Sequence, residues 1–266
     1  MKSTHKNCVV IQRRWCYNVN MDTHINIDEG QPKNKYGKDY MNSRILPRWL
    51  KILSNICFFV VTVLALVTAV LACIFIRTSV KGPSMQPLIN SLWTEENQIE
   101  DTVMINRLKK GERGDIIVVD RTEESDDRYV IKRLVAIGGD RVAIVPIKNE
   151  SGHETGYFHI QLIKKGEGTP TIVDDGITNM AKTYEKFKAL KSDSNFKFET
   201  IDGIDYLFVD EGKIFYLGDN RNISRDCSTY GPVDASKVVG KVVLIVPHGQ
   251  NVFKACFNYF KSKLFG

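Results

Sequence analysis

The sequence predicts a mostly β protein: one N-terminal transmembrane helix, followed by an antiparallel β-sheet domain with an inserted smaller subdomain. Three observations predict this class. Residues 52–76 form an uncharged and largely apolar run. The residues after it contain short runs rich in Val, Ile, Tyr and Phe, separated by Gly and charged residues, as in a protein of many strands. Residues 148–205 are more polar and irregular than their flanks, which indicates an insertion.

The apolar run has the length of a membrane span. Residues 56–76 are apolar except for Thr62 and Thr68, and about 20 residues at roughly 1.5 Å each cross the hydrocarbon core of a bilayer. A helix in a soluble core would show a polar stripe, which this run lacks. A cleavable signal peptide has an apolar core of only about 7–15 residues and a small-residue cleavage site. Here the run is longer, and Arg77 and Lys81 follow it directly.

Charge is distributed unevenly along the chain. The formal net charge is +6, and residues 1–51 carry all of it, with ten Lys and Arg against four Asp and Glu. A basic segment beside a span stays in the cytoplasm, so we expect a single-pass cell-membrane protein with residues 77–266 outside. Because those residues are neutral overall, we expect no nucleic-acid partner.

Six segments follow from these patterns. They are a basic cytoplasmic tail (1–51), the transmembrane helix (52–76), the first part of a β-core (77–147), an inserted cap-like subdomain (148–205), the second part of the core (206–248) and a basic aromatic C-terminal segment (249–266). The sequence leaves open whether translation starts at Met1 or at Met41. In the last segment Phe253, Phe257 and Phe260 have helical spacing, which fits a helix on a membrane surface or a terminal helix packed on the domain.

The apolar runs predict seven strands and one short helix in the exported part. The strands are expected at 115–119, 129–137, 141–146, 157–163, 206–209, 213–217 and 241–246, and the helix at 178–191. Cys227 and Cys256 are the two cysteines expected outside, and their spacing does not show whether they bond. Since no motif has the spacing of metal ligands, we expect no metal and no other cofactor.

Four segments could carry chemistry. Taken singly, each is typical of a loop, a turn or a strand, although a lysine inside an apolar strand is unusual because burying its charge costs several kcal/mol. In order along the chain they are Gly82-Pro83-Ser84-Met85-Gln86-Pro87, Arg113-Gly114-Asp115 with the apolar 116–119, Tyr129-Val130-Ile131-Lys132-Arg133 followed by 136–140, and Leu217-Gly218-Asp219-Asn220-Arg221-Asn222-Ile223-Ser224-Arg225-Asp226.

Together and in this order, behind a membrane anchor, the four segments resemble the type I signal peptidase family in its bacterial, Gram-positive-like Ser/Lys form. The resemblance covers residues 45–248. It implies a membrane-anchored serine endopeptidase that removes N-terminal signal peptides from exported preproteins, cleaving after small residues at positions −1 and −3. The expected partners are therefore the signal peptides of secreted preproteins and membrane lipid.

The resemblance also implies roles for single residues. Ser84 matches the nucleophile and Lys132 the general base, which must be desolvated to be neutral near pH 7. Ser224 matches a serine that hydrogen-bonds and orients this lysine. The Ser84 N–H would form half of an oxyanion hole. Gly82 stands where some members have a serine as the second donor, so that donor stays open.

Further matches concern structure and substrate pockets. Asp219 matches a carboxylate that pairs with Arg133, and Asp226 a second structural carboxylate. The usual arginine partner of Asp226 is replaced by Ser228, so its ion pair is lost or moved to Arg225 or Arg221. The residues that match the substrate pockets are Val80, Met85, Val118 and Ile131.

Two other interpretations explain fewer of these residues. A self-cleaving Ser/Lys repressor would be cytosolic and would carry a DNA-binding domain, unlike this anchored chain. A non-catalytic, membrane-anchored β-domain could act as a binding or scaffold protein. Loss of Ser84 or Lys132 would indicate such a protein, and both residues are present.

Overall fold

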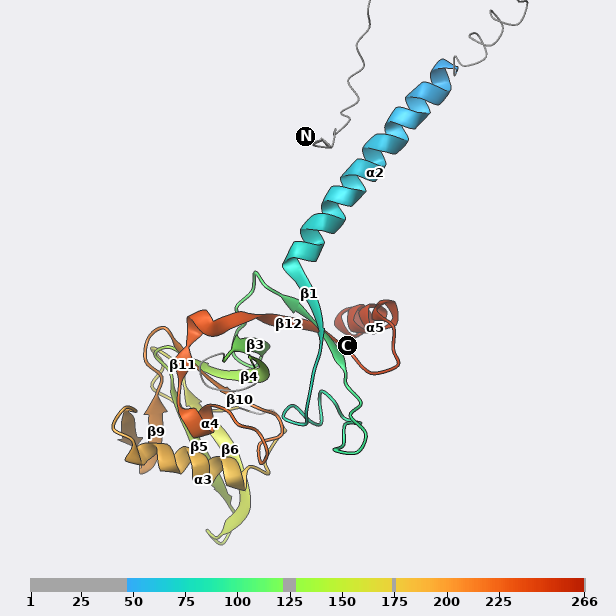
Figure 1. Ribbon diagram of the computed structural model, residues 1–266. Helices are drawn as coiled ribbons and strands as arrows, with labels where there is room; N and C mark the ends of the chain where they lie inside the picture. Colours follow the sequence, from blue (N-terminus) through green and yellow to red (C-terminus); the bar gives the residue numbers. More distant parts are fainter. Residues whose placement is uncertain (1–46, 122–127, 174–175, 266) are drawn as a thin grey trace, which may run out of the picture. The chain divides into compact units, whose positions relative to one another are not determined.

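The computed structural model describes residues 47–121, 128–173 and 176–265 (Figure 1). The chain divides into two units, residues 1–60 and 61–266. Helix α2 runs from Arg48 to Ile74. It begins in the first unit and continues into the second. The predicted basic tail lies outside the described residues as far as residue 46.

Helix α2 is the segment predicted to cross a membrane. It has 27 residues and none of them is buried. Its most apolar window has a mean hydropathy of 2.9, and it alone among the helices of the described ranges is long and apolar enough for a span. The helix begins earlier than predicted and ends at Ile74. Phe75 and Ile76 start a strand instead, because they pair with Asn106 and Ile105.

The larger sheet of the second unit has seven antiparallel strands in the order β1-β2-β12-β3-β4-β10-β11. These strands are β1 (Phe75–Ser79), β2 (Thr102–Asn106), β3 (Ile116–Asp120), β4 (Tyr129–Ile137), β10 (Lys213–Leu217), β11 (Val233–Asp234) and β12 (Val238–Val246). The first four residues of β3 are all buried, so this central strand is covered on both faces. Strand β12 alternates buried and half-buried residues along its length.

A second, five-stranded antiparallel sheet is inserted between β4 and β10, in the order β7-β6-β5-β9-β8. Its strands are β5 (Arg141–Lys148), β6 (Glu154–Ile163), β7 (Thr171–Val173), β8 (Phe198–Ile201) and β9 (Ile204–Phe208). Helix α3, Ala181–Ala189, packs on this sheet, with the Tyr184 ring 4.8 Å from that of Phe158. One buried cluster joins Leu134 of the first sheet to Leu207 of the second. The two sheets therefore share a core, and a separate subdomain at 148–205 stays a prediction.

The sequence located most of these elements. Each of the seven predicted strands is present, and β4 and β10 have the predicted bounds. Five strands were missed: β1 continues the apolar run of α2, β2 was not recognised, and β7, β8 and β11 have only two to four residues. The predicted helix at 178–191 is α3, followed by the short helix η1. The remaining short elements are η1 (Leu190–Ser192), α4 (Cys227–Tyr230) and η2 (Ala235–Lys237).

The chain's last helix, α5 (Val252–Phe265), packs on the first sheet. Ala255 is buried, and it forms a cluster with Leu244 and Val246 of β12 and with the half-buried Cys256. The structure thus shows the terminal packing that the sequence left as one alternative. Cys256 and Cys227 are not joined by a disulfide.

Asp140 joins the two sheets. This fully buried carboxylate lies between β4 and β5 and accepts two hydrogen bonds of 2.7 Å from Arg113. The backbone N–H groups of Ile137 and Lys165 donate to it as well, each at 2.9 Å. Burial by itself raises the pKa of Asp140, but the guanidinium and the two N–H groups outweigh it and lower the pKa below its ordinary value.

Replacing Asp140 should destabilise the fold. We expect Asp140→Asn to lower the free energy of unfolding at pH 7 by about 1–3 kcal/mol, because it leaves the bonded groups without their charged partner. The exposed Asp202→Asn is the control and should change it by less than about 0.5 kcal/mol. The difference in free energy of unfolding between the native chain and Asp140→Asn should shrink as the pH falls below the ordinary carboxyl pKa. A carboxyl group whose pKa is lowered by folding stabilises the fold only at pH values where it is ionised. Denaturant unfolding in detergent measures both, and equal stabilities would contradict this role.

Candidate active site

A serine hydroxyl and a lysine amine meet between the loop after β1 and strand β4. Ser84 Oγ lies 2.9 Å from Lys132 Nζ, although the two residues are 48 positions apart in the chain. Lys132 Nζ also donates to the carbonyl oxygen of Ile131 at 2.9 Å. Only 3% of Lys132 is exposed. The sequence segments 82–87 and 129–133 therefore form one site.

Burial changes the charge of the lysine. Desolvation is the largest influence and lowers the pKa of Lys132 from 10.5 to about 8. The negative charges of Asp226 and Asp219 raise this pKa and the positive charge of Arg121 lowers it. With a pKa near 8, roughly a tenth of the molecules hold a neutral amine at pH 7, far more than for an exposed lysine. The amine can therefore accept a proton at neutral pH.

Ser224 lies at the site but does not make the predicted hydrogen bond to Lys132. It is 1% exposed, and within the described ranges its hydroxyl has no hydrogen-bond partner. The neighbours of Lys132 Nζ are Ser84 and the Ile131 carbonyl instead, while the Ser224 hydroxyl packs against Gly218. The predicted hydrogen bond between Ser224 and Lys132 is thus not formed in this structure. Its orienting role stays a prediction.

Arg133 and Asp219 fix β4 to the loop after β10. Arg133 Nε donates to Asp219 Oδ1 at 2.8 Å, and Nη2 to Oδ2 at 2.6 Å. This is the pair that the resemblance implies. Successive residues of a strand point to opposite faces, so holding Arg133 on one face directs Lys132 to the other.

Asp226 begins helix α4 and supports the loop before it. Its Oδ2 accepts from the Gly218 N–H at 2.9 Å. Its Oδ1 accepts from the N–H of Ser228 at 3.1 Å and from the hydroxyl of Ser228 at 2.7 Å. The residue that replaces the family arginine is therefore itself a hydrogen-bond donor to Asp226. Arg221 donates from Nε to the carbonyl of Gly218 at 2.9 Å.

Two residues that the sequence analysis missed hold the serine loop on its N-terminal side. The buried Asn90 donates from Nδ2 to the carbonyls of Val80 at 2.7 Å and Gly82 at 2.9 Å. Asn90 and Asp101 also bond each other twice, at 2.6 and 2.7 Å, and Asp101 accepts from the N–H of His248 at 2.9 Å. Asn90 has a φ of 60°, a backbone conformation that asparagine adopts more readily than most other residues.

The other side of the loop is held by the segment after β10. The N–H of Asn220 donates to the Ser84 carbonyl at 3.1 Å, and its side-chain amide donates to the Pro83 carbonyl at 3.1 Å. Gly218 allows this approach, because a Cβ there would lie 2.6 Å from the Ser84 carbonyl oxygen. The glycine is thus required by close packing. The segment 217–226 therefore positions the loop 82–87, which carries Ser84.

A groove of about 550 Å³ opens beside Ser84 and Lys132. Three of the four predicted pocket residues, Val80, Val118 and Ile131, line it. Met85 does not: it is 1% exposed and packs in a buried cluster. The chain turns directly after Ser84, so the Met85 side chain points into the core and not into the groove.

The predicted oxyanion donors lie at the same groove. Within the described ranges the Ser84 N–H has no hydrogen-bond acceptor of its own, so it can donate to a bound group. Gly82 also lines the groove and has a φ of +78°, a conformation that L side chains rarely adopt. A serine at this position would be strained. The second donor stays open.

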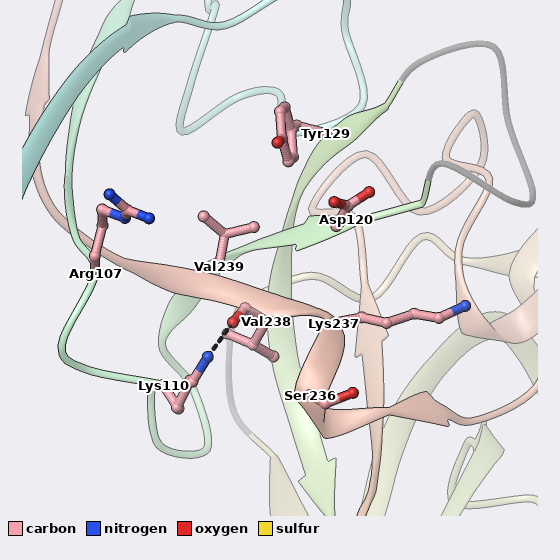
Figure 2. Close-up of a pocket in the computed structure, with 8 residues that line it drawn as sticks. All are labelled: Arg107, Lys110, Asp120, Tyr129, Ser236, Lys237, Val238 and Val239. Atoms are coloured by element: carbon pink, nitrogen blue, oxygen red, sulfur yellow. Dashed lines mark hydrogen bonds between the residues drawn. The ribbon is translucent and has the colours of Figure 1, made fainter.

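A second hollow of about 530 Å³ adjoins this groove at Tyr129, which lines both (Figure 2). Its other walls include the cationic Arg107 and Lys110 and the carboxylate of Asp120. Lys110 Nζ donates to the Val238 carbonyl at 2.5 Å, so this amine is already hydrogen-bonded to the protein backbone. Neither Ser84 nor Lys132 reaches this hollow.

A nucleophile within reach of a desolvated base is the arrangement of an enzyme that forms a covalent intermediate. The model of the family described as signal peptidase, peptidase S26, matches residues 53–247. The chain therefore belongs to this family, as the resemblance in the sequence predicted.

The chain is also similar to individual proteins. The chain is 28% identical over 165 residues to a signal peptidase I of Rickettsia akari (strain Hartford), covering 59% of this chain and 54% of the relative. It is 29% identical over 170 residues to a signal peptidase I of Rickettsia massiliae (strain Mtu5), with the same coverages. The chain thus spans about half the length of the curated relatives it matches. A signal peptidase I of Enterococcus faecalis V583 is 24% identical and covers 50% of this chain and 97% of its own, with a TM-score of 0.28.

The close packing at Gly218 can be tested. We expect Gly218→Ala to displace the serine loop and to slow reaction of Ser84 with a serine-directed acylating reagent by about 100-fold, because small misplacements of a nucleophile are costly. Gly168→Ala is the matched control, since a Cβ at Gly168 meets nothing within 4 Å and its φ is not in the left-handed region. Mass spectrometry of the labelled chain measures both rates. Equal rates would contradict the packing argument.

Proposed function

We propose that the chain is a membrane-anchored serine endopeptidase that removes N-terminal signal peptides from exported preproteins. The observation that carries the proposal is the 2.9 Å contact between Ser84 Oγ and the buried Lys132 Nζ. Membership of the signal peptidase family supports the substrate class.

The proposed reaction uses the neutral amine as a base. Lys132 accepts the Ser84 hydroxyl proton while Oγ attacks the carbonyl carbon of the scissile bond. The oxygen that becomes negative is stabilised by the Ser84 N–H. The Lys132 ammonium then protonates the leaving amine, which frees the mature protein and leaves the signal peptide as an ester on Ser84. A water molecule, deprotonated by the same amine, hydrolyses this ester and restores both residues.

An open strand edge supports binding of an extended peptide. Strand β3 pairs with β4 from Tyr129 to Arg133, but β10 pairs with β4 only from Arg133 to Ile137. Residues 129–132 therefore have an edge that neither β3 nor β10 covers, and the groove lies beside them. We propose that the substrate adds a strand here through main-chain hydrogen bonds. Val80, Val118 and Ile131 would then line shallow apolar pockets for small residues at −1 and −3.

The anchor would bring the site to its substrate. Helix α2 ends at Ile74, and Ser84 follows only ten positions later in the chain. We propose that α2 spans the cell membrane with the basic tail inside, so that the site lies outside near the surface from which signal peptides emerge. The alternative, a non-catalytic scaffold, gives no reason for burying a lysine against a serine at a cost in stability.

Removing either reacting group should abolish cleavage. We expect Ser84→Ala and Lys132→Ala each to slow cleavage of a preprotein with an Ala-X-Ala site by at least about 1,000-fold, because each variant lacks one half of a unit that acts together. Ser151→Ala and Lys148→Ala, at exposed positions, are the controls and should keep full activity. Gel analysis of the preprotein measures cleavage, and circular dichroism checks folding. Undiminished cleavage by the Ser84 or Lys132 variant would refute the proposal.

The pH dependence should report the lysine. Because the reacting form of Lys132 is neutral and its pKa is about 8, kcat/KM should rise about tenfold from pH 6 to 7 and level off above about pH 9. The positive charge of Arg121 lowers this pKa, so Arg121→Gln should move the midpoint to higher pH. Steady-state rates across this range measure it. A flat profile from pH 6 to 9 would exclude Lys132 as the base.

A further inference from the structure

Helix α5 exposes an aromatic stripe. Phe253, Phe257 and Phe260 are 88%, 68% and 61% exposed. Their spacing of four and three residues places them on one side of the helix. The packed residue Ala255 lies on another side, against β12. Helix packing therefore leaves three large apolar rings in contact with water, which is unusual for a soluble domain.

Lysines border this stripe. At about 100° per residue, Lys254 and Lys261 fall together beside the phenylalanines, on the side away from the packed face. Both are exposed. The sequence from residue 235 to residue 266 contains five lysines and no Asp or Glu. The surface of α5 thus combines exposed aromatic rings with a purely positive charge.

We propose that the aromatic stripe of α5 docks on the anionic surface of the membrane in which α2 is anchored. Aromatic rings beside lysines are the composition of a helix that lies in a bilayer interface. A second copy of the chain is disfavoured as the occupant, since two such faces would bring lysines together. This inference concerns a surface outside the active site and does not rest on the proposed reaction.

The connections of the sheet favour a membrane as the occupant. Strand β1 starts at the residue after α2, and the Ile74 carbonyl accepts from the N–H of Arg107 at 3.0 Å. Strand β12, on which α5 packs, is separated from β1 by β2 alone. The residues that leave the apolar helix and those that hold α5 therefore belong to strands of one sheet with a single strand between them. A bilayer around α2 is accordingly available to α5 at high effective concentration, so a weak affinity suffices.

The first experiment places a tryptophan in the stripe. The full chain, in a Ser84→Ala background so that cleavage plays no part, carries either Phe257→Trp or the control Tyr157→Trp, at a position that is 53% exposed on β6. Each is reconstituted into vesicles of anionic phosphatidylglycerol with or without brominated acyl chains. The fluorescence of the chain without the added tryptophan is subtracted from each. We expect brominated lipid to quench the tryptophan added on α5 and to leave the one added on β6 unquenched.

Two further arms separate lipid from other occupants. In zwitterionic vesicles, or after Lys254→Glu together with Lys261→Glu, quenching of the tryptophan on α5 should be partly lost, because the lysines no longer attract the surface. Unquenched emission from this tryptophan in brominated anionic vesicles would overturn the proposal. The proposal would also be overturned if the fluorescence of this tryptophan in detergent showed that it is shielded from water to a degree that depends on protein concentration. That result would indicate that a second copy of the chain covers the stripe.

Discussion

Burial of a lysine amine against a serine is the interaction on which the rest of the site depends. Taking Lys132 out of water lowers its pKa to about 8 and makes it able to accept a proton. The same burial costs stability, so the strand that carries the lysine has to be held in place. The ion pair of Arg133 with Asp219 does this from the opposite face of β4, because adjacent residues of a strand alternate.

The serine must also be held, and two unrelated parts of the chain do so. Asn90 binds the carbonyls before Ser84, and Asn220 binds those of Pro83 and Ser84 itself. Asn90 is hydrogen-bonded in turn to Asp101, the residue before β2. A loop would otherwise sample many conformations, so these hydrogen bonds restrict the position of Ser84, the proposed nucleophile, before any substrate binds.

The excess positive charge, the uncovered apolar residues and the exposed aromatic rings lie in three different parts of the chain. The excess of positive charge lies in residues 1–51, the apolar residues without cover lie along α2, and the exposed aromatic rings lie on α5. The basic composition of the whole chain thus comes from its N-terminal segment, while residues 52–266 carry equal numbers of acidic and basic side chains. The buried core, by contrast, is shared by two sheets that Asp140 joins.

The sequence by itself determined the apolar helix, the seven main strands and the family, because periodicity, length and short motifs are local properties. It also predicted Ser84 and Lys132 as the reacting pair, and these two side chains lie 2.9 Å apart in the structure. Only the tertiary structure decided that Met85 points into the core, that Ser224 lacks its expected contact and that Asn90 holds the serine loop. Those facts depend on which distant segments meet, and hydrogen bonds between residues far apart in the chain leave no periodic signal in the sequence.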